Sequence, residues 1–429
     1  MNRRPHLVMG VIALALASCG DSEGVEPPLD DPAAAIVAVQ VAARVPSTAA
    51  ANVAGQAISD FGLDLFTALR SDSQAGDDVT VSPASVAFAL AMLEPGAVGD
   101  AQTQLRSLLR IEDPAAFHAS MNALEQSLEA RVPTAFSPDD DPGEVLVRVA
   151  NAAYLQHGYP FEPAYLESVG ANYGPVLNEV DFATDPDAVA HAINAFVAEA
   201  TNDRIPQLVA DGAIDPLTVL ALVNALYLKA SWLTTFDEAQ TTDQPFKLLD
   251  GAEQTVQMMH GGSDSSASGD GWIGATKTYV GGLTAQFILP DEGRFDEIAS
   301  NLRGTFTEYD TNRTTGSTLG LPRFDLRFGA ELSPALKSLG LIAPYSEGGL
   351  LDVANDPQLI VDQVIHQTNV SMNEEGTEAA AATVVLVSAT SAPANPPVPV
   401  VLDRPFLYRI IDDQSGATLF VGQVLDPLN

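Results

Sequence analysis

Residues that could carry covalent or metal chemistry are few in this 429-residue chain, and they form no recognisable catalytic pattern. The single cysteine is Cys19, so neither an intramolecular disulfide nor a zinc site built from paired cysteines can form. The six histidines lack the HExxH spacing that places two imidazoles on one helix face. No GxSxG or Walker A motif occurs. We therefore expect no enzyme, no bound metal and no cofactor.

Cys19 ends an N-terminal segment that is typical of an exported lipoprotein. Two arginines precede an apolar run of 11 residues, Leu7 to Ala17, which is too short to span a bilayer but suits a signal peptide. The run ends Leu-Ala-Ser-Cys, which resembles the bacterial lipobox. The resemblance implies that residues 1–18 are removed and that acyl chains on Cys19 anchor the protein to the cell envelope. Gly20 in second place favours the outer membrane or cell surface. The alternative is an ordinary signal peptide with an incidental cysteine.

The charge balance argues against polyanionic partners. Lys and Arg number 20 against 56 Asp and Glu, a net charge of −36. Such a chain repels nucleic acid, so we expect no nucleic-acid partner. Hydrophobic residues make up 46% of the chain, which is enough to bury a large core.

The pattern of apolar residues predicts one α+β domain. Residues 19–55 are rich in Ala, Pro and Asp and predict a lipid-anchored spacer, and the domain is expected over 56–429. Ser82 and Pro83 are typical of a helix N-terminus. Helical spacing recurs at 101–110, 114–130, 187–200 and 331–339. Strand patterns occur at 145–155, 218–229, 283–289, 321–328, 361–372, 405–412 and 418–424.

The segment 361–400 combines the features of a loop with those of a spare strand. No proline occurs between Pro357 and Pro393, so the residues from 377 to 390 can enter the middle of a sheet, where proline is excluded. In a strand, every second residue from Thr377 to Val387 would share one face, and all of these side chains are small or β-branched and uncharged. The alternative is an alanine-rich helix, because four alanines follow Glu378.

Here the sequence resembles the serpin family, and the resemblance runs through some 370 residues in the family's order. The motifs, as they stand in this chain, are Phe61-Gly62-Leu63-Asp64-Leu65-Phe66, Val81-Ser82-Pro83, Gly96-Ala97-Val98-Gly99, Val180-Asp181-Phe182, Ile193-Asn194, Asn224-Ala225-Leu226-Tyr227-Leu228-Lys229-Ala230-Ser231-Trp232, Val256-Gln257-Met258-Met259, Leu321-Pro322-Arg323-Phe324, Arg404-Pro405-Phe406 and Phe420-Val421-Gly422.

The resemblance implies a serpin fold: a large, mostly antiparallel central sheet, further sheets, eight to nine helices and an exposed reactive centre loop at about 374–400. It assigns a polar cluster beneath the sheet to Ser82, Ser85, Asn224 and His366. It assigns the hinge of the loop to Glu374, Glu375, Gly376, Thr377, Glu378, Ala379, Ala380, Ala381, Ala382 and Thr383.

The same resemblance implies an inhibitor of serine proteases that acts as a suicide substrate. The protease cuts the loop, and the cut loop enters the sheet as a new strand; serpin loop insertion is itself a known case of strand addition. Counting as the family does places the cut at Thr390–Ser391, with Ala389–Thr390 and Ala392–Pro393 as alternatives. The small residues before the cut suit elastase-like or subtilisin-like enzymes, and papain-like cysteine proteases are further candidates.

Two further expectations concern partners. Residues 101–131 hold only three arginines, so no heparin-type cofactor is expected, and we expect a monomer. The alternative function is a non-inhibitory serpin-fold binding or carrier protein on the cell surface. The absence of charge and proline at alternate hinge positions from Thr377 to Thr383 favours the inhibitor.

Overall fold

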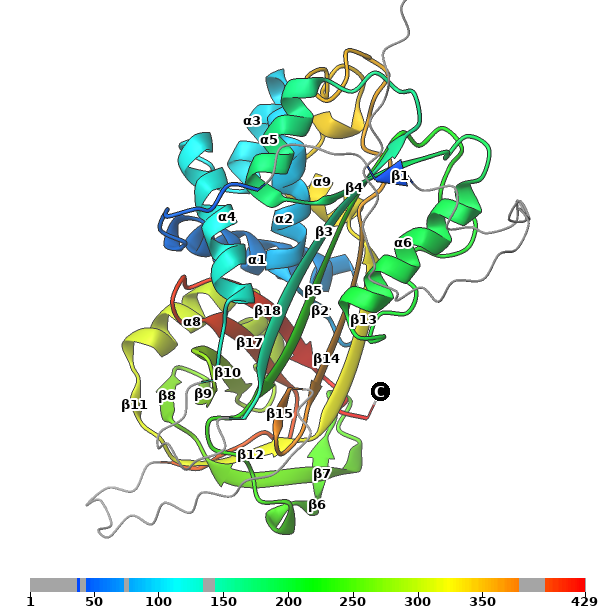
Figure 1. The fold of residues 1–429 in the computed structure, drawn as a ribbon. Coiled ribbons are helices and arrows are strands. Elements are labelled where there is room, and N and C mark those ends of the chain that lie inside the picture. The colour runs from blue at the N-terminus through cyan, green and yellow to red at the C-terminus, as the bar shows by residue number, and fades with distance from the viewer. Residues whose placement is uncertain (1–36, 39–43, 73–76, 134–142, 378–397, 429) are drawn as a thin grey trace, which may run out of the picture.

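The computed structural model describes residues 37–38, 44–72, 77–133, 143–377 and 398–428 (Figure 1). The helices in these ranges are α1 (Asn52–Asp72), α2 (Pro83–Leu93), α3 (Gly99–Leu108), α4 (Pro114–Glu129), α5 (Pro163–Tyr173), α6 (Pro186–Ala200), α7 (Phe295–Ser300), α8 (Leu302–Thr311) and α9 (Ser333–Ser338). The strands are β1 (Val37–Ala38), β2 (Thr80–Val81), β3 (Val145–Gln156), β4 (Val176–Val180), β5 (Leu220–Ser231), β6 (Thr242–Lys247), β7 (Glu253–Gly262), β8 (Ser265–Gly269), β9 (Trp272–Tyr279), β10 (Leu283–Pro290), β11 (Thr314–Thr315), β12 (Thr318–Pro322), β13 (Phe324–Glu331), β14 (Ile365–Met372), β15 (Gly376–Thr377), β16 (Val400–Val401), β17 (Phe406–Asp412) and β18 (Thr418–Val424).

The strands form three sheets. The central sheet has the order β1-β4-β3-β5-β15-β14-β13, and only its β3–β4 pair is parallel. The second sheet has the order β11-β8-β9-β10-β17-β18-β2, and the third has the order β16-β12-β7-β6. The prediction of an α+β protein with a large, mostly antiparallel central sheet is confirmed.

Helices lie on both faces of the central sheet at β3 and β5, whereas buried residues alternate with more exposed ones along β13 and β14. α2 lies between β5 and β18, and all but one of its residues are buried, which explains why it is apolar all round. On the opposite face, Val189, Ile193 and Val197 of α6 pack with Val223 and Ala225 of β5. Figure 1 shows α6 across the sheet from the group α1–α5.

Local chemistry explains where the α2 helix begins. The Ser82 side chain accepts a hydrogen bond from the backbone N–H of Ser85 at 3.3 Å, and Pro83 occupies the first helical position. The predicted N-terminus is confirmed. Helices α4, α5 and α6 also begin with proline.

The described structure continues upstream of residue 56, where the sequence predicts the start of the domain. α1 begins at Asn52, and residues 44–51 lie against α4 and α5. This contact is made by hydrogen bonds from an alanine- and proline-rich stretch, so it leaves no apolar periodicity in the sequence. The strand predicted over 361–372 starts only at Ile365, and α5, α7 and α8 were not predicted.

No helix among the described residues combines the length and the apolarity that a membrane crossing needs.

Candidate functional site

The central sheet contains a slot between β5 and β14. Within the described ranges, no ladder pair joins these two strands directly, and only the two residues of β15 connect them. Gly376 and Thr377 pair with Ser231 and Ala230 on β5, and Thr377 pairs with Met372 on β14. Because an unpaired strand edge can accept a further strand, the slot is a candidate site for strand addition.

The first hinge residues lie inside the sheet, which corrects the prediction of an exposed loop from residue 374. Glu374 and Thr377 are each 3% exposed, and Gly376 is buried as well. At the other end of the loop, Val400 is also buried, in β16. The range of the exposed loop was implied by the family resemblance, which does not indicate that its first residues are buried.

Glu374 is buried because it has charged and polar partners. Arg323 Nε donates to both carboxylate oxygens of Glu374 at 2.8 Å, and the hydroxyl of Thr241 donates to one of them. Burial alone would raise the pKa of the Glu374 carboxyl, but these hydrogen bonds outweigh it and lower the pKa below its ordinary value. The hinge is therefore anchored by an ionised carboxylate at the end of the slot where β15 lies.

Thr377 shows which face of the incoming strand points into the molecule. Its hydroxyl lies 2.8 Å from that of Tyr279, and both side chains are buried. The Tyr279 ring stacks on Trp232, with centroids 4.0 Å apart. Trp232 in turn donates its backbone N–H to the carbonyl of Glu375 at 2.7 Å. The stacked pair of Tyr279 and Trp232 thus contacts the hinge at both Thr377 and Glu375.

Glycine is the residue type that fits position 376 in β15. Its φ is +152°, and an added Cβ would come within 2.0 Å of the Ala230 carbonyl oxygen. Glycine therefore permits the close approach of the hinge to β5, in addition to the backbone freedom that the sequence indicated.

The predicted polar cluster lies at the N-terminus of α2, directly beneath the slot. The backbone N–H of Ser82 donates to Nε2 of His366 on β14 at 3.1 Å. The Ser85 hydroxyl donates to the carbonyl of Asn224 on β5 at 3.4 Å. The structure thus brings all four residues together. The N-terminus of α2 therefore contacts both edges of the slot.

Burial keeps His366 neutral. The ring is 5% exposed, and this lowers the pKa of His366 from 6.5 to about 4. A neutral ring is also what the contact requires, because Nε2 accepts the Ser82 hydrogen bond.

Several predicted site residues lie outside the described ranges. These are Cys19, Glu378, Ala379, Ala380, Ala381, Ala382, Thr383, Thr390 and Ser391.

The sequence reasoning missed the partners of the hinge and of the cluster. Arg323 and Trp232 stood in the family motifs without an assigned role, and Tyr279 stood outside them. A further missed pair extends the cluster: Asn224 Nδ2 donates to Oδ1 of Asn151 on β3 at 2.7 Å. The sequence could have indicated the pairing of Asn151 with Asn224, because an amide side chain on the buried face of a strand requires a hydrogen-bond partner.

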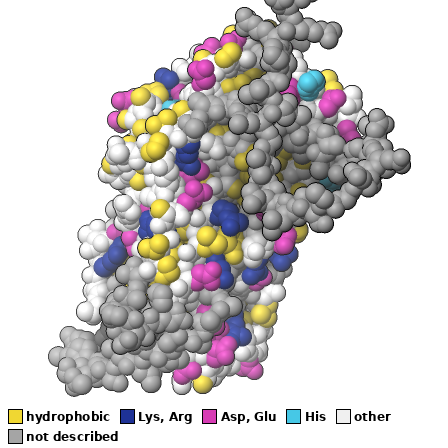
Figure 2. Space-filling view, viewed as in Figure 1, with side chains coloured by type: hydrophobic (Ala, Val, Ile, Leu, Met, Phe, Trp, Pro, Cys, Tyr) yellow, Lys and Arg dark blue, Asp and Glu magenta, His cyan; other side chains and the backbone are white. Residues whose placement is uncertain are grey.

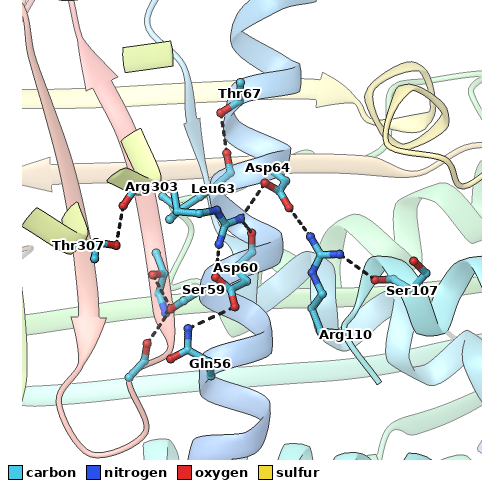
Figure 3. Close-up of polar contacts among 12 residues, drawn as sticks. Gln56, Ser59, Asp60, Leu63, Asp64, Thr67, Ser107, Arg110, Arg303 and Thr307 are labelled. Atoms are coloured by element: carbon cyan, nitrogen blue, oxygen red, sulfur yellow. Dashed lines mark hydrogen bonds and ion pairs between the residues drawn. The ribbon is translucent and has the colours of Figure 1, made fainter. Parts of the chain in front are cut away.

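A separate depression of about 560 Å³ lies between α1, α8 and the end of α9. Figure 3 shows that its charged side chains are already paired with one another. Arg303 contacts both Asp60 and Asp64, and Arg110 donates to Asp64 at 2.7 Å. These pairs join α1 to α8 and to the end of α3, which is a structural role.

Comparison with known proteins identifies the class. A model of the serpin family, described as serpin (serine protease inhibitor), matches residues 56–427. Leukocyte elastase inhibitor from Sus scrofa is 31% identical over 386 residues, covering 86% of this chain and 97% of the relative. Serpin-ZXA from Oryza sativa subsp. japonica is 33% identical over 389 residues, covering 86% of this chain and 96% of the relative.

Solved structures agree with this match. The native stressed conformation of Arabidopsis AtSerpin1 superposes with a TM-score of 0.74 at 26% identity, covering 88% of this chain and 98% of that one. Human thyroxine-binding globulin, at 22% identity and a TM-score of 0.76, covers 88% of this chain and 100% of that one and shares the fold. The chain belongs to the serpin family, and the predicted serpin fold is confirmed.

The hinge anchor makes a first prediction. Glu374→Gln removes the charge from a buried carboxylate that Arg323 contacts, so we expect a loss of about 2 kcal/mol in stability and a lower Tm. Thermal unfolding at a fixed scan rate measures it. Glu253→Gln, at an exposed position on β7, is the matched control. Equal Tm values for the two variants would contradict the anchoring role.

His366 makes a second prediction. The unfolded chain binds a proton near pH 6.5, whereas folded His366 binds one only near pH 4. The contribution of neutral His366 to stability is therefore complete above pH 6.5 and falls by up to about 3 kcal/mol as the pH drops toward 4.

His366→Gln retains an acceptor without a proton to gain, so its Tm should fall less steeply between pH 6.5 and 4. Other carboxyl groups also titrate in this window, so the comparison is made with wild type and with His191→Gln, at an exposed position on α6. Parallel curves for all three proteins would refute the role of His366.

Proposed function

We propose that this serpin is a suicide-substrate inhibitor of serine proteases. The observation that carries the proposal is β15, which already occupies the first two positions of a strand between β5 and β14. Membership of a family described as serine protease inhibitors supports it, as does similarity to a relative named leukocyte elastase inhibitor.

The register of β15 determines how the strand would continue. Gly376 lies opposite Ser231 and Thr377 opposite Ala230, so antiparallel continuation along β5 would place residue 387 opposite Leu220. Alternate residues after Thr377 would point inward like Thr377 itself, and these are the small, uncharged ones. About ten new ladder bonds at about 1 kcal/mol each would contribute on the order of 10 kcal/mol. This is comparable with the stability of a whole domain.

Both ends of the loop are held in the sheets, which explains why a cut is needed. β15 is fixed in the slot, and β16 pairs in parallel with β12 in a different sheet. An uncut loop therefore cannot enter the slot fully without stretching or releasing β16. Cleavage would free the N-terminal part from this second attachment.

The chemistry of the cut is supplied by the protease. Its serine Oγ attacks the carbonyl of Thr390, the peptide bond breaks, and Ser391 leaves with a free amine. The acyl-enzyme ester is then carried along as residues from 377 onward enter the slot, before water can hydrolyse it. In this scheme the serpin contributes bait and driving force and is not itself a catalyst.

The proposed targets are elastase-like and subtilisin-like serine proteases. Val387, Ser388, Ala389 and Thr390 are small and uncharged, which fits a shallow specificity pocket and not a trypsin-like one. Papain-like cysteine proteases are further candidates, because they also form an acyl-enzyme.

The location and assembly state are proposed from sequence alone. The leader and Cys19 support an acylated protein of a bacterial cell envelope, at the outer membrane or cell surface. A monomer is the proposed state, since one molecule contains the bait, the hinge and the slot.

Covalent trapping is the decisive test. A form that starts at Gly20 is mixed with pancreatic elastase and, separately, with subtilisin, and the products are separated on a denaturing gel. We expect a band at the summed mass and, by mass spectrometry, a released peptide that begins at Ser391. Complete cleavage without such a band would exclude the inhibitor function for these enzymes. No cleavage by either enzyme would favour the carrier alternative.

A hinge variant tests whether insertion is what traps the protease. Ala381→Arg places a charge on the inward face of the proposed strand, so insertion should become too slow to outrun deacylation. We expect the covalent band to fall at least tenfold while cleavage continues. Ala394→Arg adds the same charge beyond the cut and should trap normally. Equal trapping by the two variants would exclude insertion along this face.

A further inference from the structure

The segment before α1 is attached to the helices by its backbone. The N–H of Val45 donates to the carbonyl of Ala171 on α5 at 3.0 Å, and Asn122 Nδ2 on α4 donates to the carbonyl of Val45 at 2.7 Å. The Ser47 hydroxyl donates to the carbonyl of Ala119 at 2.8 Å. Residues 44–51, which we call the strap, are therefore bound along α4.

Arg44 gives the strap its charged contact. Its Nε donates to Oδ1 of Asn122 at 2.7 Å, and its Nη1 donates to Oε1 of Glu125 at 2.8 Å. The Glu125 side chain is 4% exposed and that of Arg44 is 21% exposed. A charge-assisted hydrogen bond to so deeply buried a carboxylate is strong, and loss of the arginine would leave the carboxylate without its counter-charge.

Glu125 connects the strap to the central sheet. Its second oxygen, Oε2, accepts from Asn151 Nδ2 on β3 at 3.1 Å. Asn151 in turn accepts from Asn224, which lies directly opposite it on β5, and the Asn224 carbonyl accepts from Ser85. A continuous chain of hydrogen bonds thus leads from Arg44 to the edge of the slot.

This chain crosses the boundary at which the sheet must open. α1 packs on α4 and on β18, and β14 contacts β2, which pairs with β18; we call these elements the body. Packing of α4 on β3 crosses from this body to the other side of the slot. For a full strand to enter beside β14, β5 must move away together with its partners β3 and β4. The bond between Glu125 and Asn151 joins α4 of the body to β3 of the moving part. Upstream of the strap, β1 also pairs with β4, with Ala38 opposite Asn178.

The charges around Glu125 support a restraining role for Arg44. Burial raises the pKa of Glu125 to about 7, and Glu129 adds to this, while Arg44 and Asn151 oppose it. Tyr173 and Glu94 also face the cluster, and Glu94 is itself paired with Arg106 and His118. Arg44 is the counter-charge that bonds Glu125 directly.

We propose that the strap restrains opening of the central sheet. In this proposal Arg44 joins the strap to β3, because it contacts Glu125, which in turn accepts a hydrogen bond from Asn151. The proposal rests on the insertion mechanism of the proposed function and adds a positioning residue that sets its rate. Release of Arg44 lowers the cost of moving β3 and β5, so strand entry becomes faster.

The test measures strand entry without any protease. A fluorescent synthetic copy of residues 377–390 is incubated with the protein at pH 7.5, and the rate of its incorporation is followed by native gel. We expect Arg44→Ala to take up the peptide about tenfold faster than wild type, as the loss of one charge-assisted bond implies. Arg110→Ala, which removes an exposed arginine of the same helical region, should take it up at the wild-type rate.

A double-mutant cycle separates this restraint from a merely structural role. Glu125→Gln retains an acceptor for Asn151 but removes the charge that Arg44 contacts. If Arg44 acts through Glu125, adding Arg44→Ala to this variant should change the uptake rate less than twofold. Full additivity of the two changes would overturn the proposal that Arg44 restrains the sheet through Glu125.

The remaining outcomes distinguish the two proposals. Equal uptake by wild type and Arg44→Ala, with a lowered Tm in the variant, would overturn the strap and leave the insertion mechanism standing. No uptake by either protein would overturn both. Uptake by Arg44→Ala and none by wild type would support the strap in its strongest form.

Discussion

The structure depends on an incomplete ladder in its central sheet. β5 and β14 share only the two residues of β15 between them, and the rest of each facing edge has no ladder partner in the described part of the chain. Backbone N–H and C=O groups that are buried require partners, and in the proposed mechanism a full strand between β5 and β14 would supply them. The contacts of the hinge and of the N-terminus of α2 join the two strands, β5 and β14, that border this gap.

These contacts lie at two places along the gap. At the end of the slot where β15 lies, Glu374 accepts a hydrogen bond from Arg323, and the Thr377 hydroxyl contacts that of Tyr279. Beneath the sheet, the N-terminus of α2 touches His366 on one edge and Asn224 on the other. On the surface drawn in Figure 2, acidic and basic side chains are interspersed. The excess of acidic residues in the chain is therefore not gathered into one patch on this face.

The sequence predicted what depends on near neighbours and missed what depends on distant ones. The N-terminus of α2 followed from Ser82 and Pro83, and Thr377 is buried as the alternation predicts, while the rest of that face lies outside the described residues. The burial of Glu374 could not be predicted, because its partner Arg323 is 51 residues away. Arg44 and Glu125 are 81 residues apart, so the strap had the composition of a linker and was assigned to one. The family motifs supplied the class and the four-residue cluster, while the geometry supplied the reason for each residue.

The order of the strands along the chain has a consequence for synthesis. β2 pairs with β18, with Val81 opposite Val421, so the second sheet cannot be completed until the last residues are made. β14 and β15, by contrast, are joined by a short turn, and a hairpin of this kind closes within microseconds. The local β14–β15 pair is therefore expected to form before the distant β2–β18 pair. Completion of the second sheet, which needs both β2 near the start of the described domain and β18 at its end, is therefore expected to be a late step in folding.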